Sequence, residues 1–567
     1  MNVLGIWGYS ADSKGPTHES GACLVSDGKL LAAVTEERLS RKKNDGAYPF
    51  RAIQEVLRIT GARVSDLDLV SLAGLPPFRR SAKMLASQWE VFRDSGIVLP
   101  RRILYALLTA KKIRRAVPES LRSVPRMEWE HHYCHAAAAF FTSPFDRATV
   151  ITLDGIGDSS ICGSIGVGEG DSLRRIREFN GYYSPGILYS FITKVFGFRP
   201  ARHEGKITGL AAYGDPNLCY EPFRSLLRYE VQKQRFYSRW IPTLFAPGSE
   251  DLWAIPLVSD LLDQYEKKDI AASLQRVLEE EVIKMVCDAL SATAIPDVVL
   301  AGGVFGNVKL NQRIRELEGV RGLYIHPGMG DDGLMVGAAY LGLRALARKR
   351  RLPFRREFLQ TVYLGPDFSE GQIQAELQKR GLSGRRSDRV EEEIAEHLAQ
   401  KKIVGRFAGR MEYGPRALGN RTILAEPRDR SINDWLNKRL KRTEFMPFAP
   451  SLLEEDAGRY LNGWQPDQVA ARFMTVTYDV HPEVRDQCQA VVHVDGTARP
   501  QVVRREDNES YHRVLTAYKR RTGLPIVVNT SFNIHEEPIV CSPEDAIRSY
   551  LLGCVDVLVL ENVIVSR

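Results

Sequence analysis

The chain has 567 residues, of which 44% are hydrophobic and 26% are charged, the composition of an ordinary globular protein. This length exceeds what one hydrophobic core supports, so we expect at least two domains and exclude a small binding module and a disordered or fibrous protein. The formal net charge of +8 is mildly basic and is compatible with an anionic ligand, a nucleic acid or an acidic membrane surface.

The cysteines and the N-terminal residues predict a reduced, cytoplasmic protein. The eight cysteines lie far apart and form no Cys-x-x-Cys pair, so neither a zinc ribbon nor a disulfide framework is expected. The first residues lack the basic leader of a signal peptide. No apolar run approaches the ~18 residues of a membrane span. We therefore expect a cytoplasmic protein without a membrane span.

The first predicted elements in chain order are three short strands. Val3–Trp7, Gly21–Ser26 and Leu30–Thr35 are rich in β-forming residues. Asp27-Gly28, between the last two runs, favours a tight hairpin turn. A helical stretch is predicted next, near residues 50–60. The protein is therefore expected to begin with a β-sheet.

Residues 78–117 are the main source of the basic excess, with ten Lys or Arg residues against Glu90 and Asp94. The apolar residues of this segment fit one or two amphipathic helices broken at Pro100. A solvated basic face, a lid over an anionic or bulky acceptor, and a helix on a membrane surface are all compatible with this pattern.

Strands and helices alternate over the following residues. Ala148–Leu153, Asp297–Leu300 and Leu323–His326 resemble strands and Asp269–Leu290 a helix, which predicts a mixed α/β fold. The charged, proline-bearing segment Arg344–Arg356 is typical of a linker, so we place the domains at residues 1–358 and 359–567. In the second domain we expect a helix at Glu391–Gln400, strands at Ile403–Phe407, Pro525–Val528 and Val557–Leu560, and a helix that begins at Ser542-Pro543.

Three of the 11 histidines lie together at the head of an alanine-rich helical run, in His131-His132-Tyr133-Cys134-His135. His131 and His135 are four residues apart and share a helix face, so both can bind one metal ion. His132 and His135, three residues apart, could do the same, and spacing alone prefers neither pair. An isolated His-x-x-x-His pattern is explained equally well by two structural histidines that cap a helix or form hydrogen bonds in the core.

Two aspartates that follow predicted strands favour a cation site. Asp154 stands in Asp154-Gly155-Ile156-Gly157, and Asp331 in Gly330-Asp331-Asp332-Gly333. Carboxylates that leave strands beside glycines can coordinate a cation, and the neighbouring backbone N–H groups can bind phosphates. Two imidazoles and two carboxylates suit Fe(II), Mn(II) or Zn(II). The glycine-rich segment Ala301–Asn307 would let a nucleotide or substrate approach the backbone.

These motifs resemble, in the same order and over nearly the whole chain, those of the NodU/CmcH-type O-carbamoyltransferases. The resemblance implies an α/β protein with an N-terminal actin-like domain (ASKHA, duplicated ribonuclease-H-like) and a C-terminal YrdC-like α/β domain. The matching segments are Thr17–Ala22, Glu36–Lys43, His131–Ala139, Asp154–Gly157, His203–Ala211, Ala301–Asn307, Gly330–Gly337, Gly409–Arg421, Pro447–Pro450, Asp495–Arg499 and Asn529–Asn533.

The resemblance implies an enzyme that uses ATP with Mg(II) to convert carbamoyl phosphate to carbamoyl-adenylate. The carbamoyl group would then pass to a hydroxyl of a sugar or antibiotic scaffold. No nucleic-acid partner is implied, and a homodimer is compatible with the family. Arginine forks suit phosphates. The residues implied to bind ATP and carbamoyl phosphate are Arg416, Arg421, Lys441, Arg499, Ser531 and Asn533.

One departure from the family pattern concerns a catalytic lysine. The motif lysine falls on Leu440, so Lys441 or Lys438 would replace it. Arg442 retains its motif position and is assigned a catalytic role.

In the first domain the resemblance implies that His131, His135, Asp154 and Asp331 hold Fe(II), or else Mn(II) or Zn(II), as a Lewis acid. His18 is the candidate general base, although a structural histidine is equally compatible with the sequence. Lys206, expected in a glycine turn, is implied to contact phosphate. The residues implied to bind the nucleotide in this domain are Gly155, Gly157, Gly302, Gly303 and Asn307.

Two other functions are compatible with related modules. A tRNA threonylcarbamoyl-type or hydrogenase-maturation enzyme uses both domains, but the maturation enzyme has the reverse order and zinc-finger cysteines, and no RNA-binding module is recognisable here. A non-catalytic actin-like nucleotide-binding sensor would leave the histidine cluster and the arginine-rich second domain without a purpose.

Overall fold

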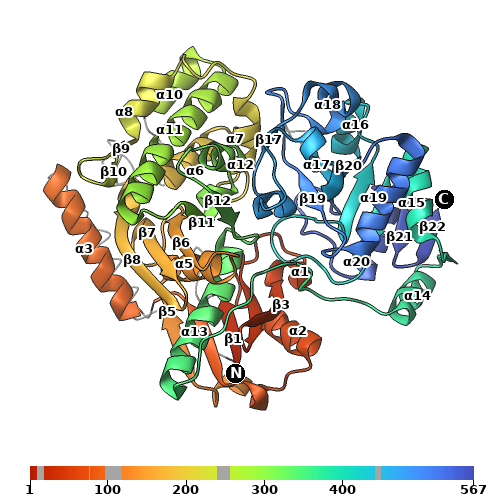
Figure 1. Ribbon diagram of the computed structural model, residues 1–567, viewed down its shortest axis with the longest axis horizontal. Helices are drawn as coiled ribbons and strands as arrows, with labels where there is room; N and C mark the ends of the chain where they lie inside the picture. Colours follow the sequence, from red (N-terminus) through yellow and green to blue (C-terminus); the bar gives the residue numbers. More distant parts are fainter. Residues whose placement is uncertain (9–17, 76, 96–117, 239–255, 441–447, 567) are drawn as a thin grey trace. The chain divides into compact units, whose positions relative to one another are not determined.

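The computed structural model describes residues 1–8, 18–75, 77–95, 118–238, 256–440 and 448–566 (Figure 1). The chain forms two compact units. It passes from one to the other between Leu359 and Gln360, and two short N-terminal segments belong to the second unit. Unit 1 comprises Met1–Leu31, Gly46–Ile53 and Thr60–Leu359, and unit 2 comprises Ala32–Asp45, Gln54–Ile59 and Gln360–Arg567.

The first sheet of unit 1 has the strand order β3-β2-β1-β4-β5. β1 (Asn2–Trp7) pairs antiparallel with β2 (Gly21–Ser26) and parallel with β4 (Leu69–Ala73), which pairs parallel with β5 (Arg126–Trp129). β3 (Lys29–Thr35) follows the predicted turn, where Asp27 and Gly28 have φ of 47° and 96°. Two successive positive φ angles suit the turn of a tight hairpin. The three predicted strands and their turn are confirmed.

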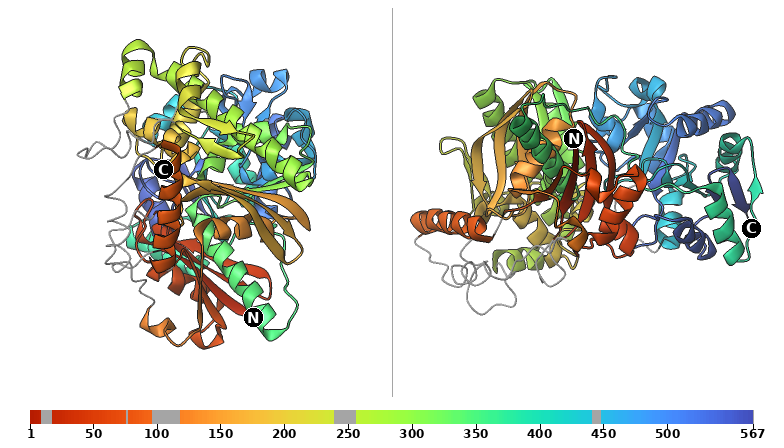
Figure 2. Two further views of the ribbon diagram at one scale, coloured as in Figure 1. Left: turned by 90° about the vertical axis from the view of Figure 1, so that its left-hand side faces the viewer. Right: turned by 90° about the horizontal axis from the view of Figure 1, so that it is seen from below.

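The second sheet of unit 1 repeats this topology, with the order β12-β11-β6-β7-β8. β6 (Arg147–Leu153) pairs antiparallel with β7 (Ile161–Glu169) and parallel with β11 (Asp297–Ala301). β11 pairs parallel with β12 (Gly322–Ile325), and β8 (Ser172–Asn180) lies beyond β7. Figure 2 shows β7 and β8 as long, curved strands. Written from its other end, the order is β8-β7-β6-β11-β12, which matches β3-β2-β1-β4-β5 of the first sheet. In each sheet the central strand, β1 or β6, pairs antiparallel with the next strand of the chain and parallel with its other neighbour.

Helices cover both faces of the second sheet. On β6, Thr149 Oγ1 is 2.6 Å from Thr293 Oγ1 of α11 (Lys267–Thr293), whereas Thr152 Oγ1 is 3.1 Å from His132 Nδ1 of α5 (His131–Phe141). Odd and even positions of a strand point to opposite faces, so α5 and α11 lie on opposite sides. The other helices of unit 1 are α3 (Pro77–Ser95), α6 (Pro185–Val195), α7 (Glu204–Ala211), α8 (Tyr220–Leu226), α10 (Pro256–Gln264), α12 (Val308–Arg315) and α13 (Leu334–Arg350), with a small sheet of β9 (Arg228–Glu230) and β10 (Arg235–Tyr237). Helix α2 (Phe50–Thr60) begins in unit 1, and its residues Gln54–Ile59 belong to unit 2.

Unit 2 is built on one mixed sheet with the order β13-β22-β21-β14-β15-β20-β16-β19. β14 (Val404–Phe407), β20 (Ile526–Ser531) and β21 (Val557–Leu560) confirm the three predicted strands. The other strands of this sheet are β13 (Arg385–Arg386), β15 (Arg421–Ala425), β16 (Ala449–Leu453), β19 (Gln501–Val503) and β22 (Val563–Ser566), and β17 (Tyr478–Asp479) and β18 (Thr497–Ala498) form a separate two-stranded sheet. The helices are α1 (Glu36–Ser40), α14 (Glu370–Lys379), α15 (Val390–Ala399), α16 (Ser431–Arg439), α17 (Glu454–Tyr460), α18 (Pro482–Gln487), α19 (Glu509–Thr522) and α20 (Pro543–Leu551).

Helix α20 begins where the sequence predicts a helix. Ser542 Oγ accepts the backbone N–H of Asp545 at 3.3 Å, and Asp545 Oδ2 accepts the N–H of Ser542 at 3.0 Å. These reciprocal bonds form a capping box and satisfy two N–H groups that the helix itself leaves free. Pro543 occupies the first helical position, where its missing N–H costs nothing. The predicted helix start is confirmed.

The described part of the basic segment 78–117 is helix α3, and residues 96–117, including Pro100, lie outside the described residues. The apolar side of α3 is turned outward, since Leu85, Trp89 and Phe92 are 39%, 65% and 37% exposed. The side facing unit 1 carries polar residues beside the buried Val91, and Ser87 Oγ donates to Ser160 O at 3.2 Å. α3 therefore attaches through hydrogen bonds and Val91, while Leu85, Trp89 and Phe92 are turned outward.

Two further expectations concern the thiols and the membrane. All eight cysteines are free and all but Cys287 are buried, as expected of reduced core thiols. Within the described ranges, no helix combines the length and the apolar character needed to cross a bilayer.

Candidate metal centre and phosphate-binding residues

Helix α5 carries the histidine cluster, and Glu130 fixes its N-terminal end. The Glu130 carboxylate accepts the backbone N–H groups of His132 and Tyr133, both at 2.9 Å. Burial opposes the ionisation of Glu130, but the Arg175 guanidinium and hydrogen bonds lower its pKa to about 2. An ionised carboxylate at the positive end of a helix is stabilising. The cap therefore holds the first turn of α5, from which His131 points.

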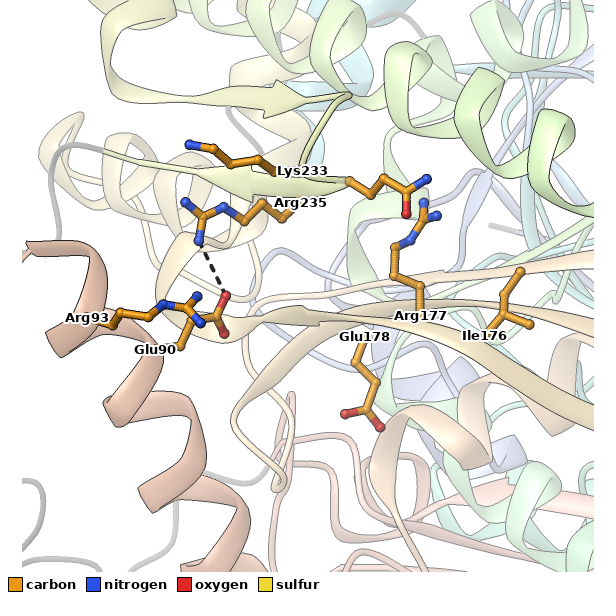
Figure 3. A pocket seen from close by; sticks show the side chains of 8 residues that line it. Glu90, Arg93, Ile176, Arg177, Glu178, Lys233 and Arg235 are labelled. Atoms are coloured by element: carbon orange, nitrogen blue, oxygen red, sulfur yellow. Dashed lines mark ion pairs between the residues drawn. The ribbon is translucent and has the colours of Figure 1, made fainter.

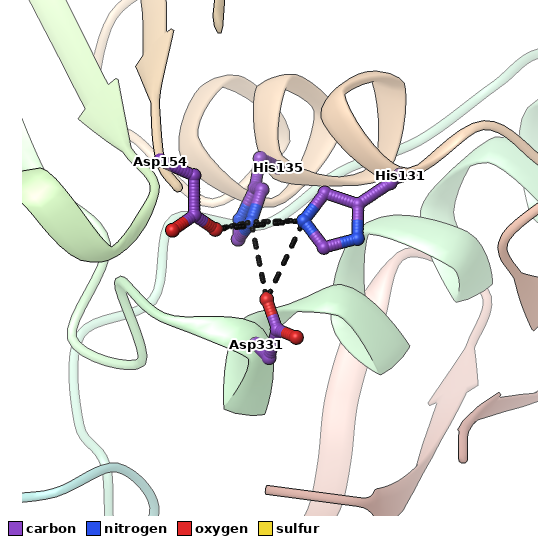
Figure 4. A group of neighbouring side chains, drawn as sticks. All are labelled: His131, His135, Asp154 and Asp331. Carbon is purple, nitrogen blue, oxygen red and sulfur yellow. Dashed lines mark hydrogen bonds and ion pairs between the residues drawn. The ribbon is translucent and has the colours of Figure 1, made fainter. Parts of the chain in front are cut away.

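The side chains of His131, His135, Asp154 and Asp331 converge on one point (Figure 4). One ligand atom from each lies within 4.8 Å of all the others. His135 Nε2 is 3.1 Å from His131 Nε2 and 3.2 Å from Asp154 Oδ2. His131 Nε2 is 3.4 Å from Asp331 Oδ1. The structure thus brings together the four residues that the sequence analysis assigned to a metal.

Sheet topology explains why the two aspartates meet. Asp154 follows β6 and Asp331 follows β12, and both strands run parallel to β11 between them. The carboxyl ends of parallel strands lie at one edge of a sheet, where open α/β proteins bind their ligands. Asp331 begins a short 3₁₀ turn, Asp331–Gly333, and is buried. Asp154 and Asp331, which are 177 positions apart in the sequence, therefore lie close together in unit 1.

The donor set fits a divalent transition metal. Nitrogen and oxygen ligands at ~2.0–2.2 Å from one ion are roughly 2.8–3.6 Å apart in tetrahedral or cis octahedral positions. The distances of 3.1–3.6 Å that join the two histidine nitrogens to each other and to the carboxylates fall in this range. Imidazole and carboxylate together suit Fe(II), Mn(II) or Zn(II). His135 Nδ1 is buried and has no hydrogen-bond partner in the described part of the chain. The polar contacts of this ring are thus made at Nε2, the atom that faces the carboxylates.

His132 is a core residue and not part of this group. Its Nδ1 lies 3.1 Å from Thr152 Oγ1 and its Nε2 lies 3.0 Å from the Ile161 carbonyl oxygen. Burial, together with the charge of His131, lowers the pKa of His132 to about 3. Both of its ring nitrogens are occupied and the ring is neutral. The structure therefore selects His131 and His135 from the two pairs that spacing allowed.

His18 lies beside the four residues. Trp7 Nε1 donates to the His18 carbonyl oxygen at 3.2 Å, and the Trp7 ring meets the His131 ring edge-on at 5.7 Å. Burial lowers the pKa of His18, but the carboxylates of Asp331 and Glu19 raise it to about 10. Without a bound metal ion the His18 imidazole is therefore protonated, and its positive charge is stabilised by these carboxylates. Its role as a general base stays a prediction.

Glycines allow the backbone to approach the centre closely. A Cβ atom on Gly157 would lie 2.9 Å from His132 Cδ2, and one on Gly303 would lie 3.0 Å from Asp154 Oδ1. Gly302 has a φ of +107°, and its Cβ would lie 2.2 Å from the Leu153 carbonyl oxygen. Any side chain at these positions would displace a neighbour or strain the backbone. The need for glycine at these three positions is explained by the close packing of their backbone against neighbouring residues of the centre. Contact of these glycines with a nucleotide stays a prediction.

Other predicted residues of unit 1 lie in helices and caps. Asn307 is the N-cap of α12, where its Oδ1 accepts a backbone N–H of the first turn at 3.1 Å. The expectation of a glycine turn at Lys206 is wrong: this residue lies in the first turn of α7 and is buried, with Nζ 5.3 Å from the Phe198 ring centre. Gly205 and Gly209 lower helix propensity without breaking the helix. Gly155 has room for a side chain, because a Cβ atom on it would lie 3.9 Å from Ile187 Cγ1, an ordinary contact distance.

In unit 2, three of the predicted phosphate-binding residues lie on two neighbouring strands or just after one of them. Arg421 begins β15, and the next residue, Thr422, pairs with Ser531 at the end of β20. Ser531 Oγ donates to Asn533 Oδ1 at 2.6 Å. The Arg421 carbonyl oxygen accepts the N–H of Phe532 at 3.1 Å. Sheet pairing thus places these residues together although about 110 positions separate them.

The segment Gly409–Arg421, called here the signature loop, is held by Glu412. Glu412 Oε1 accepts the backbone N–H groups of Leu418 at 2.8 Å, Asn420 at 2.7 Å and Arg421 at 3.1 Å. A buried carboxylate is stable only when it is well paired, and three N–H donors provide that pairing. Glu412 therefore holds the loop from within.

Arg421 is fully buried, and its two terminal nitrogens donate to backbone carbonyl oxygens. Nη1 donates to the Ala408 carbonyl oxygen at 2.8 Å and Nη2 to that of Pro366 at 3.2 Å. The guanidinium lies 3.6 Å from the Phe407 ring centre. Burial lowers the pKa of Arg421 to about 10. These contacts are those of an arginine that supports the loop, and phosphate binding by Arg421 stays a prediction.

The remaining predicted residues of unit 2 lie near the same loop or outside the described residues. Arg416 belongs to the signature loop and is half-buried. Arg499 lies two residues before Gln501, whose Nε2 donates to the Leu418 carbonyl oxygen of that loop at 2.7 Å. Lys441 and Arg442 lie outside the described residues, so their roles stay predictions.

An open pocket of about 640 Å³ lies beside α3 in unit 1 (Figure 3). Arg235 pairs with Glu90 at 3.6 Å, and Arg177 pairs with Asp288. Much of the basic charge around this pocket is thus balanced within unit 1. The residues that line it are Glu90, Arg93, Ile176, Arg177, Glu178, Lys233, Gln234 and Arg235.

Comparisons with known proteins agree with the resemblance. The family model described as carbamoyltransferase N-terminus matches residues 13–340, and the one described as carbamoyltransferase C-terminus matches residues 395–567. Nodulation protein NolNO of Sinorhizobium fredii (strain NBRC 101917 / NGR234) is 35% identical, over 97% of this chain and 79% of that protein. Nodulation protein U of Rhizobium tropici is 31% identical, over 92% of this chain and 90% of that protein.

Likeness to solved structures is more distant. HypF of T. kodakarensis has a TM-score of 0.35 at 15% identity, and the match covers 61% of this chain and 48% of that one. The family assignment therefore depends on the sequence matches, which span both units. On that evidence the chain belongs to the carbamoyltransferase family and is a carbamoyltransferase enzyme.

Proposed function

We propose that this carbamoyltransferase is ATP-dependent and works in two stages. Residues 359–567, a YrdC-like domain, would form carbamoyl-adenylate from carbamoyl phosphate. Residues 1–358, an actin-like domain, would transfer the carbamoyl group to a hydroxyl of a sugar or antibiotic scaffold. The repeated sheet topology of unit 1 supports a duplicated ribonuclease-H-like domain. The observation that carries the proposal is the convergence of His131, His135, Asp154 and Asp331 in a chain of this family.

The activation stage consumes carbamoyl phosphate, ATP and water. Water releases phosphate and leaves carbamate, whose oxygen then bonds to the α-phosphorus of ATP while the bond to pyrophosphate breaks. The products are carbamoyl-adenylate, pyrophosphate and phosphate. Bringing anionic reactants together requires fixed positive charge and hydrogen-bond donors. The residues that would provide them are Arg416, Arg421, Lys441, Arg442, Arg499, Ser531 and Asn533, with Mg(II) bound to ATP.

In the transfer stage the acceptor oxygen bonds to the carbamoyl carbon, its proton leaves, and AMP is released. Fe(II), Mn(II) or Zn(II), held by the two histidines and two aspartates, would supply Lewis-acid polarisation of the carbonyl. His18 lies beside these residues. A bound divalent metal would offset the carboxylate charge that keeps this imidazole protonated, so His18 would then be neutral and would take the proton. The residues that would hold the adenylate are Lys206, Gly155, Gly157, Gly302, Gly303 and Asn307.

Pyrophosphate release tests the proposal before an acceptor is known. The purified protein is incubated with carbamoyl phosphate, ATP, Mg(II) and Fe(II), and the released pyrophosphate and phosphate are measured. We expect both products in equal amounts, and no pyrophosphate when carbamoyl phosphate is omitted. Absence of pyrophosphate from a protein shown to bind metal would overturn the ATP-dependent mechanism.

A further inference from the structure

A short N-terminal segment, Ala32–Asp45, belongs to unit 2, although the residues before it, Met1–Leu31, lie in unit 1. It includes helix α1, which ends at Arg41 in the left-handed conformation, with φ of 61°. Glu37 and Arg38 on this helix are buried. Buried charges are costly unless they have partners. The partners of this segment therefore show what it does in unit 2.

Arg38 contacts the signature loop. Its Nη2 donates to the carbonyl oxygen of Gly414 at 2.9 Å, two residues before Arg416. The Arg38 side chain is only 6% exposed, and its Nε lies 3.5 Å from Glu37 Oε1. Glu37 in turn accepts the backbone N–H of Asn44 at 2.8 Å. Arg38 is thus held by its own segment while it fixes the backbone next to Arg416.

Arg41 contacts the loop that precedes α20. Its Nη1 donates to the Ile539 carbonyl oxygen at 2.7 Å and its Nη2 to that of Pro538 at 2.9 Å. Its Nε lies 3.0 Å from Oδ1 of Asp545, whose carboxylate belongs to the capping box of α20. The same loop begins at Asn533, whose Nδ2 donates to the carbonyl oxygen one residue before Pro538, at 2.7 Å. Arg41 therefore holds the loop that follows the predicted phosphate contact.

Leu39, between the two arginines, adds an apolar contact to both loops. It packs against a buried cluster of Met411 and Ala417 from the signature loop and Ile539 and Cys541 from the loop before α20. Leu39 is partly buried in this contact. Three successive side-chain contacts thus join one N-terminal segment to both loops.

We propose that Arg38 and Arg41 are positioning residues for the activation stage. They hold the loops that carry Arg416 and Asn533, so the N-terminal segment completes the site for ATP and carbamoyl phosphate in unit 2. This inference rests on the proposed function of unit 2. A guanidinium offers several donors in one plane and can bond two carbonyls and a carboxylate at once, which an ammonium on a flexible stem cannot. A displacement of about 1 Å in a positioning group can cost roughly a hundredfold in rate.

The test compares four full-length variants with the wild-type protein. Arg38→Met and Arg41→Met remove the contacts, and Arg38→Lys keeps the charge and one donor. Arg58→Met is the matched control, because Arg58 is an exposed residue of α2 that pairs with Glu55. The kcat and KM of carbamoyl-phosphate-dependent pyrophosphate release are measured, together with Tm and bound metal.

We expect Arg38→Met and Arg41→Met to raise the KM for ATP or carbamoyl phosphate roughly tenfold or more, with bound metal unchanged. Arg38→Lys should recover part of this loss, and Arg58→Met should match the wild type. Wild-type KM and kcat in the folded Met variants would overturn the inference alone. If Arg38→Met fails to fold, Arg38→Lys decides, because wild-type constants in that variant overturn the inference equally. Absence of pyrophosphate release from the wild type would instead overturn the proposed function and this inference with it.

Discussion

A Cβ atom on Gly337 would lie 1.8 Å from the carbonyl oxygen of Cys134, so α13 and α5 meet backbone to backbone. α5 carries His131 and His135, and α13 begins three residues after Asp331. The contact therefore sets the distance between the histidine helix and the turn that carries the aspartate. No side chain larger than hydrogen can occupy this position without moving one of the two helices.

Gly337→Ala should therefore destabilise the protein by about 1–3 kcal/mol, because the group it meets is backbone and cannot rotate away. The same displacement should weaken metal binding. Urea unfolding and equilibrium dialysis against Zn(II) or Fe(II) measure the two effects. Gly205→Ala is the control, since among the described residues only its chain neighbours and the backbone of α7 itself lie within 4 Å of its Cβ position. This change should leave stability equal or slightly higher. Equal behaviour of the two variants would contradict the backbone contact.

His132→Ala should lower stability without removing the metal. The change removes the His132 hydrogen bonds to Thr152 and to the Ile161 carbonyl oxygen and leaves a cavity, at a cost of about 1–3 kcal/mol. Its ring nitrogens do not face the carboxylates, so one metal per chain should remain. His131→Ala should instead lose the metal. Metal analysis after dialysis separates the two, and loss of metal from both variants with intact folding would assign His132 to the centre.

His135→Ala should abolish carbamoyl transfer and leave pyrophosphate release largely intact. The residue lies in unit 1, whereas the residues predicted to bind ATP and carbamoyl phosphate lie in unit 2. Pyrophosphate release is measured without an acceptor, and transfer is followed by mass spectrometry as the addition of one carbamoyl group to an acceptor. Equal loss of both activities would contradict the division of the two stages between the domains.

Arg421→Lys should affect mainly the stability of the protein, whereas Arg416→Lys should affect mainly substrate binding. Arg421 bonds backbone carbonyls and lies on Phe407, so its replacement should destabilise the protein by about 2–4 kcal/mol. Arg416 is half-buried in the loop, and its replacement should raise the KM for ATP or carbamoyl phosphate while Tm stays near the wild-type value. Thermal unfolding and steady-state kinetics of both variants check this. A stable Arg421→Lys with only a raised KM would make Arg421 a phosphate ligand.

Glu391 should make the free energy of unfolding depend on pH under acidic conditions. Burial raises the pKa of this carboxyl, but a backbone N–H, the Ser510 hydroxyl and the Arg513 guanidinium lower it by more. A lowered folded-state pKa contributes stability that is present above the unfolded pKa of about 4.3 and lost as pH falls through the folded value.

Glu391→Gln should therefore cost about 1 kcal/mol at pH 7 and progressively less below pH ~4. Urea unfolding at several pH values measures this difference. Glu370→Gln is the control, because Glu370 forms an exposed pair with Arg386 at 3.5 Å, and such pairs contribute little. A difference for Glu391→Gln that stays constant with pH would show that its charge is not involved.

Much of the secondary structure follows from local pattern. The hairpin at Asp27-Gly28 and the helix start at Ser542-Pro543 depend on backbone conformations and caps that neighbouring residues determine by themselves. The order of the motifs also identified the family, because each motif is a short local sequence. Lys206 was misplaced for the same reason, since two glycines suggest a turn locally while the packing of α7 keeps them in a helix.

The sequence by itself determined the local elements and the candidate ligands, but only the tertiary structure decided which of these candidates meet. The choice of His131 over His132 depends on Thr152 and Ile161, which occupy the ring nitrogens of His132 from another part of the chain. The attachment of Arg38 to Gly414 joins residues 376 positions apart. No local pattern contains such a contact, because it arises from strand order and helix packing, which depend on the whole chain.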